Sequence, residues 1–138
     1  MIKTSSIKIK TKGNTDLINI TEKVQSILKN SEIKEGIVII FVAGSTAALT
    51  TIEYEPGLIH DLKEFFEKIS PRHKEYNHNK IRGDSNGHAH VCASLLKPSL
   101  TIPFKNSQLL LGTWQQVTLI DFDDRHRERE VIIQVNGE

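Results

Sequence analysis

The sequence predicts an α+β fold with about eight strands and two or three helices, formed as one domain over residues 1–138. Aromatic residues make up only 6% of the chain, so Ile, Val and Leu must fill the core, and the β-branched ones among them favour strands. The strand-like segments precede, surround and follow the helical segments without strict alternation. This order favours an α+β fold over a doubly wound α/β fold.

The N-terminal segment alternates apolar and charged residues. This alternation over 7–12 (IKIKTK) is typical of a half-buried strand, and Gly13 then favours a turn. A short strand over 17–20 precedes a helix over 21–30, in which apolar residues recur at helical spacing. We expect Thr21 to be the N-cap of this helix.

The run over 36–42 (GIVIIFV) is continuously apolar, which predicts a central strand covered on both faces. Small and polar residues over 43–46 interrupt the apolar pattern, and a second strand follows over 48–52. Apolar spacing then predicts a helix over 58–69 that ends before Pro71.

The C-terminal half is predicted to be rich in strands. The segment 71–87 has almost no apolar residues and is long for a structureless connection, so we expect a loop there that is either functional or disordered. A short helix is expected over 88–97. Strands are expected over 99–104, 109–111, 114–122 and 130–135.

Composition excludes several classes of protein. Eighteen Lys and Arg residues stand against seventeen Asp and Glu residues, so the formal net charge of +1 argues against a nucleic-acid partner. A single cysteine excludes an internal disulfide framework. We expect no membrane partner, because no apolar window is long enough, and a cytoplasmic location, because the N-terminus lacks a signal-peptide pattern.

Histidines cluster in the second half of the chain. Four of the six lie within 73–90, and His78, His88 and His90 could supply the three protein ligands of a catalytic zinc-like site. Residues 88 and 90 share a face on a strand but diverge by about 200° on a helix. If Asn86 caps a helix, only one of the pair points into the site. Solvated loop histidines are the alternative.

Two other groups of residues are candidates for binding or catalysis. Gly44, Ser45 and Thr46 follow the central strand, where amides and hydroxyls could hold an anion, although a tight turn needs the same small residues. Glu53 lies in an apolar stretch that would raise the pKa of its carboxyl, so it could serve as a base or a metal ligand. A salt bridge at the end of a strand is the alternative for Glu53.

Arginines alternate along the segment before the last strand. Period two would place Arg125, Arg127 and Arg129 on one face, which suits a phosphate or pyrophosphate. The neighbouring acidic residues Asp124, Glu128 and Glu130 could instead form solvated ion pairs with these arginines.

Four motifs occur in order along the chain: FVAGSTAALT (41–50), GDSNGHAH (83–90), SLTIP (99–103) and GTWQ (112–115). Together they resemble the signature series of the YjbQ-like family, often labelled "secondary thiamine-phosphate synthase enzyme". The resemblance implies a small α+β fold with a mixed β-sandwich-like core. It also implies a homotrimer with metal or anion sites near subunit contacts.

The resemblance also ranks the candidate site residues. It implies that His78 and His90 bind metal, ahead of His88. Many members carry a further histidine where this chain has Gly44. Either His88, Glu53, water or substrate takes that coordination position, or the metal is bound weakly here. The recurrent polar positions of the family match Glu53, Asp84, Asn86, Thr46 and Gln115.

We therefore expect a trimeric enzyme that uses a divalent metal, Zn or Mg, on a small phosphorylated or anionic metabolite. The family label implies a transferase with a weak thiamine-phosphate synthase-like activity, with Glu53, Asp84, Asn86, Gln115 and Arg127 as catalytic candidates. In this hypothesis Arg127 faces the charge of the leaving group. The alternatives are a zinc-dependent hydrolase of a small substrate and a non-catalytic trimer that binds a metal or metabolite.

Overall fold

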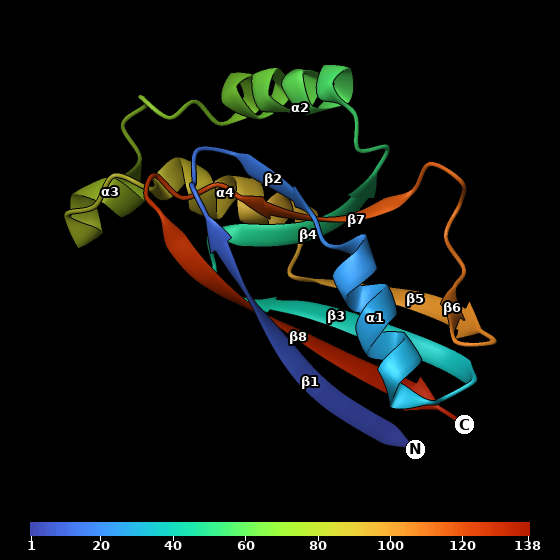
Figure 1. Ribbon diagram of the computed structural model, residues 1–138. Coiled ribbons are helices and arrows are strands. Elements are labelled where there is room, and N and C mark those ends of the chain that lie inside the picture. The colour runs from blue at the N-terminus through green and yellow to red at the C-terminus, as the bar shows by residue number, and fades with distance from the viewer.

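Two antiparallel β-sheets and four helices form the structure (Figure 1). The computed structural model describes residues 1–138. The larger sheet has five strands in the order β1 (Ile2–Thr11), β8 (Arg127–Gly137), β3 (Glu35–Ala43), β5 (Ser99–Lys105) and β6 (Gln108–Leu109). The smaller sheet has three, in the order β2 (Asp16–Asn19), β7 (Gln116–Asp121) and β4 (Ala47–Ile52). The helices are α1 (Thr21–Ser31), α2 (Pro56–Ile69), α3 (Asn77–Arg82) and α4 (Gly87–Leu96).

The smaller sheet lies between the larger sheet and a helical layer, so both of its faces are buried. On one side, side chains such as Leu49 and Leu119 join a 17-residue apolar cluster with the larger sheet and α1. On the other side, Ala48 and Ile120 pack with Phe66 of α2 and the apolar face of α4. Figure 1 shows α2 and α4 on this outer side. This arrangement confirms the predicted α+β fold with a sandwich-like core.

The larger sheet is covered on one face only, so the prediction for the central strand was half wrong. Val38, Ile40 and Val42 of β3 are fully buried. Ile37 and Phe41 point to the opposite face and are each 40% exposed. An antiparallel sheet tolerates this alternation, because only one of its faces needs to meet the core.

The structure has a helix that composition did not reveal. Helix α3 lies within the expected loop over 71–87 and buries none of its residues, so no apolar stripe marks it. Gly83 ends it in the left-handed region with φ of 63°. The long segment is therefore interrupted by a short ordered element.

The start of α1 also differs from the prediction. Ile20, not Thr21, is the N-cap residue. The Asn19 side-chain oxygen accepts hydrogen bonds from the Thr21 amide at 3.0 Å and from the Thr21 hydroxyl at 2.7 Å. The Thr21 hydroxyl in turn accepts the Val117 amide at 2.8 Å, which ties α1 to β7.

The first and last strands are longer than the alternating pattern indicated. β1 and β8 pair from Ile2 opposite Asn136 to Thr11 opposite Arg127, so pairing extends them beyond their apolar centres. By contrast, β7 begins at Gln116 and leaves Trp114 and Gln115 in a turn. No helix is both long and apolar enough to cross a membrane.

Candidate functional site

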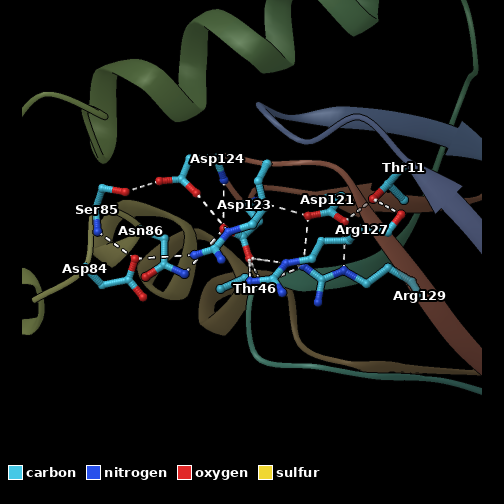
Figure 2. A network of polar contacts seen from close by, with 11 residues as sticks. Thr11, Thr46, Asp84, Ser85, Asn86, Asp121, Asp123, Asp124, Arg127 and Arg129 are labelled. Carbon is cyan, nitrogen blue, oxygen red and sulfur yellow. Dashed lines mark hydrogen bonds and ion pairs between the residues drawn. The ribbon is translucent and has the colours of Figure 1, made fainter. Parts of the chain in front are cut away.

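A buried ion pair lies where β7 ends beside β8. Asp121 has no exposed surface, and the Arg129 side chain donates to both of its carboxylate oxygens, from Nε at 2.7 Å and from Nη2 at 2.9 Å. Figure 2 shows this two-pronged contact and its neighbours. Such charge-assisted bidentate pairs fix geometry as well as contributing energy.

Asp123, also fully buried, connects this ion pair to a second arginine of β8 and to two other segments. Its carboxylate accepts the Thr46 hydroxyl at 3.0 Å, the Arg127 Nε at 3.0 Å and the Asn86 amide nitrogen at 3.3 Å. Burial alone would raise the pKa of Asp123, but the Asp124 amide and these side-chain donors outweigh burial and hold the pKa well below its usual range. Asp123 is therefore ionised across the physiological range.

The network follows from strand register. Ala47 pairs with Asp121 across β4 and β7, so Thr46 lies beside the residues that follow β7. Period two along β8 puts Arg127 and Arg129 on one face, as predicted, but that face meets buried carboxylates rather than an open anion site. The third arginine, Arg125, lies in the loop before β8, and its Nη2 is 3.5 Å from Asp84 Oδ1. Pairing with aspartates therefore replaces the expected cluster of free guanidinium groups.

Two imidazoles meet beside this network. The ring centroids of His78 on α3 and His90 on α4 lie 4.4 Å apart, and the rings are tilted by 43°. The Asn79 side-chain oxygen accepts the Gly87 amide at 2.9 Å and so joins the two helices. A Cβ at Gly87 would lie 2.7 Å from Tyr76 Cβ, so glycine allows this close approach. Both histidines are half-buried.

The environment of His90 favours a neutral imidazole. Burial lowers the pKa of His90, and the adjacent His78 lowers it further. The carboxylates of Asp123 and Asp84 act in the opposite direction but do not reverse the shift. Neutral imidazole is the form that binds a metal ion.

A cavity of about 350 Å³ opens next to His90. It is lined by Gly44, Ser45, Ala47, His90, Ala93, Ser94, Lys97 and Pro98. The exposed Ser45 hydroxyl and the Lys97 amine give it hydrogen-bond donors and one full positive charge, whereas the Ser94 hydroxyl donates to the Val91 carbonyl at 2.7 Å. The arrangement can hold an anionic group close to an imidazole.

His88 does not join the His78–His90 pair. Residue 87 begins α4 after the N-cap residue Asn86, so His88 and His90 diverge by about 200° around the helix. His88 is buried, and its Nδ1 has no hydrogen-bond partner. Burial lowers the pKa of His88, followed by the positive charge of Arg72. The predicted three-histidine set is thus reduced to two imidazoles by the helical geometry.

Three other candidate residues lie outside the His78–His90 pair. The Thr46 hydroxyl is buried between Arg129, at 2.6 Å, and Asp123, so Ser45 rather than Thr46 faces the cavity. Glu53 is exposed just beyond the far end of β4, so the apolar burial expected for it is absent. Gln115 lies at that same end and donates to the Thr51 hydroxyl at 3.0 Å.

Asp84 and Asn86 lie between the network and α4. Asp84 accepts the Ser85 amide at 2.8 Å and pairs with Arg125. The Asn86 side-chain oxygen is buried without a partner, while its nitrogen is held by Asp123. Both residues therefore support the segment that leads into α4, the helix that carries His90.

Sequence reasoning missed Asp121, Asp123 and Lys97. Two aspartates two residues apart directly after a buried apolar strand are a signal for paired burial, because an unpaired carboxylate there would be costly. Lys97 carries no such signal, since only the packing of α4 against β4 puts it at the cavity.

The His78–His90 pair offers two protein ligands for an ion rather than a closed metal site. No further His, Cys, Asp or Glu residue completes a group of three around the pair with all ligand atoms within 4.8 Å of one another. One group in the chain does meet that distance, formed by His60, Asp61 and Glu64, which are all exposed on α2. Any ion at the pair would therefore keep coordination positions for water or substrate.

Comparison with known proteins gives consistent matches. The family model described as "UPF0047 protein YjbQ-like" matches residues 5–138. A UPF0047 protein of Archaeoglobus fulgidus is 37% identical over 93% of this chain and 97% of its own length. A YbjQ-like protein of unknown function from Sulfolobus solfataricus has a TM-score of 0.90 at 34% identity, with both chains fully covered. A hypothetical protein of Aeropyrum pernix has a TM-score of 0.92 at 32% identity, with 99% of both chains covered.

We predict that Asp123→Asn lowers the free energy of unfolding at pH 7 by about 3 kcal/mol, because it leaves Arg127 and Arg129 short of a buried counter-charge. The pKa of Asp123 is lower in the folded than in the unfolded chain. Its stabilising contribution is therefore present above about pH 4 and is lost as pH falls toward the folded pKa. The variant should show a shallower decline in stability below pH 4.

Urea unfolding between pH 2 and pH 7 measures both effects. Asp61→Asn is the matched control, since Asp61 is exposed on α2 and should change stability by less than about 0.5 kcal/mol. An Asp123→Asn curve parallel to that of the unsubstituted protein at all pH values would contradict the prediction.

Proposed function

The chain belongs to the UPF0047 YjbQ-like family, and we propose that it is a metal-dependent enzyme acting on a small phosphorylated substrate at the His78–His90 pair. One observation carries the proposal: two imidazoles lie 4.4 Å apart at their centroids, and one of them, that of His90, lines a cavity with a cationic lysine. Neither feature alone indicates a substrate. Together they join a metal-ligand pair to a place for negative charge.

The donor set fits a zinc-like ion better than magnesium. Imidazole nitrogens suit zinc, whereas magnesium prefers oxygen ligands and retains water. His78 and His90 would hold the ion, and the remaining positions would be open to water or to substrate oxygens, as in catalytic sites. Such an ion would supply positive charge for an anionic leaving group.

Residues of the cavity beside His90 would bind the anionic part of the substrate. Lys97 would pair with a phosphate as a point charge, and the Ser45 hydroxyl would donate a hydrogen bond. Arg127 lies close by in the network, and its side chain is 37% exposed although it is bound to Asp123. Arg127 is therefore the proposed second cation for leaving-group charge.

We assign the reaction class from the family resemblance. A thiamine-phosphate synthase-like reaction forms a C–N bond between a pyrimidine diphosphate and a thiazole phosphate and breaks the C–O bond to pyrophosphate, which leaves with the bonding electrons. The chain's own contribution is to orient the two substrates and to balance the charge that develops on the leaving group. We expect slow turnover, because the site offers few groups that could stabilise the charge on the leaving pyrophosphate.

We further propose that the enzyme is a homotrimer joined through the open face of the larger sheet. Ile37 and Phe41 of β3 line this face, and Ile132 of β8 lies opposite Phe41. A second copy would cover the apolar side chains that β3 leaves exposed there. Glu53 and Gln115, at the far end of β4, would act on substrate only from a neighbouring subunit in this assembly.

The metal proposal predicts that the protein purified without a histidine tag binds about one Zn²⁺ per chain. His78→Ala and His90→Ala should each weaken Zn²⁺ binding at least tenfold, because each removes one of two imidazole ligands. Competition with a chromogenic chelator measures the affinity, and circular dichroism checks folding. His60→Ala is the control that tests the exposed α2 cluster. Binding that depends on His60 and not on His90 would overturn the assignment.

The catalytic proposal predicts slow product formation when authentic pyrimidine diphosphate and thiazole phosphate are supplied with Zn²⁺ or Mg²⁺. His90→Ala should abolish turnover, and Lys97→Gln should raise KM at least threefold, because it removes a cation from the anion cavity. Chromatography of the products measures both. Metal binding without any product would support a non-catalytic binding protein, and phosphate release from a single substrate would support a hydrolase.

The assembly proposal predicts a trimer by light scattering coupled to size-exclusion chromatography. Phe41→Lys should shift the protein to monomers, because it places a charge in the middle of the apolar sheet face. Ile81→Lys is the matched control, since Ile81 is 82% exposed on α3, away from that face. A monomeric parent protein, or an unchanged Phe41→Lys trimer, would show that this face does not join subunits.

A further inference from the structure

A second polar cavity, of about 340 Å³, lies between the C-terminal half of α2 and the turn that joins β1 to β2. No hydrophobic residue lines it. Its lining residues are Asn14, Thr15, Lys63, Glu67, Arg72 and His73. Two of these carry full positive charge and one carries full negative charge, so the cavity has a net positive charge of one with His73 neutral.

Arg72 is the most informative residue of this cavity. It is half-buried, yet no carboxylate oxygen lies within 4.0 Å of its guanidinium, unlike those of Arg125, Arg127 and Arg129. The nearby Glu67 carboxylate instead accepts the main-chain amide of Arg72, at 3.2 and 3.4 Å from its two oxygens. A half-buried guanidinium without a counter-charge is a ready partner for an anion.

The opposite wall is a turn with an unusual backbone. Gly13, Asn14 and Thr15 have consecutive φ values of 78°, 57° and 62°. A β-branched residue such as Thr15 rarely adopts this left-handed conformation. The Asn14 amide is anchored by the Asp123 carbonyl at 2.6 Å, so the buried network holds the turn in place. This anchoring sets the polar side chains of Asn14 and Thr15 at the cavity, facing α2.

This cavity is distinct from the cavity beside His90. The charges of Arg72 and Glu67 influence the pKa of His88, whereas His90 lines the other cavity. The two sets of lining residues have no member in common. A ligand here would therefore not occupy the proposed metal site.

We propose that this second cavity is a binding site for the phosphate group of a small phosphorylated molecule. Arg72 makes the principal two-pronged contact with the phosphate, Lys63 adds a point charge, and the polar groups of Asn14 and Thr15 donate hydrogen bonds from the turn. Glu67 holds the Arg72 main chain and, as the one carboxylate in the lining, limits the affinity. This site goes beyond the proposed function and does not depend on it.

Isothermal titration of metal-free protein with inorganic phosphate at low salt tests the site. Arg72→Gln should weaken binding at least tenfold, because it removes the charge and the fork of donors. Glu67→Gln should tighten binding about threefold or more, because the amide oxygen still accepts the Arg72 main-chain amide while the repelling charge is gone. Opposite effects from two neighbouring residues distinguish a site from a general loss of folding.

Two control variants distinguish phosphate binding in this cavity from binding to surface charge or to the cavity beside His90. Lys68→Gln removes an exposed α2 charge that does not line the cavity, and it should leave the affinity unchanged within twofold. Lys97→Gln removes the cation of the cavity beside His90, which is itself proposed to hold an anion, so it should remove any phosphate binding there and leave the Arg72-dependent binding intact. The proposal is overturned if Arg72→Gln has no effect, if Lys68→Gln weakens binding equally, or if only Lys97→Gln abolishes it.

Discussion

The buried carboxylates of Asp121 and Asp123, paired with Arg129 and Arg127, are the interaction on which the arrangement of the site depends. Both carboxylates have no exposed surface, so their desolvation must be offset by contacts of good geometry. The donors come from β1, from β8, from the residue before β4 and from the N-cap position of α4. The Asp123 carbonyl also anchors the turn beside the Arg72 cavity. The end of β7 thereby fixes several segments that are distant in the sequence.

This constraint explains why the two histidines lie where they do. Asn86, held by Asp123 at 3.3 Å, sets the first residue of α4 and thus the direction of every side chain along that helix. Asn79 then binds the Gly87 amide and places α3 against α4. His78 and His90 meet because two helices share this junction, and Gly87 leaves room for the contact. The proposed metal chemistry therefore rests on positions set by a structural ion network.

The periodic parts of this protein follow from its amino-acid order alone. Alternation over 7–12, the apolar run over 36–42 and the helical spacing over 58–69 specified elements of the correct type, because local burial patterns follow from the periods of strand and helix. The motifs also resembled those of the family, and that resemblance ranked His78 and His90 above His88. Helix α3 escaped prediction, because a helix that buries nothing has no apolar stripe.

Which polar residues meet, by contrast, is settled by the packing of distant segments. His88 and His90 are separated by the phase of α4, and Glu53 and Gln115 are separated from the histidines by the length of β4. Conversely, strand register and the packing of α4 bring together Thr46, Asn86, Asp123 and Arg129. The local pattern of apolar and polar residues predicts whether a side chain faces the core. Contact between distant side chains depends instead on strand pairing and helix packing, which no single segment encodes.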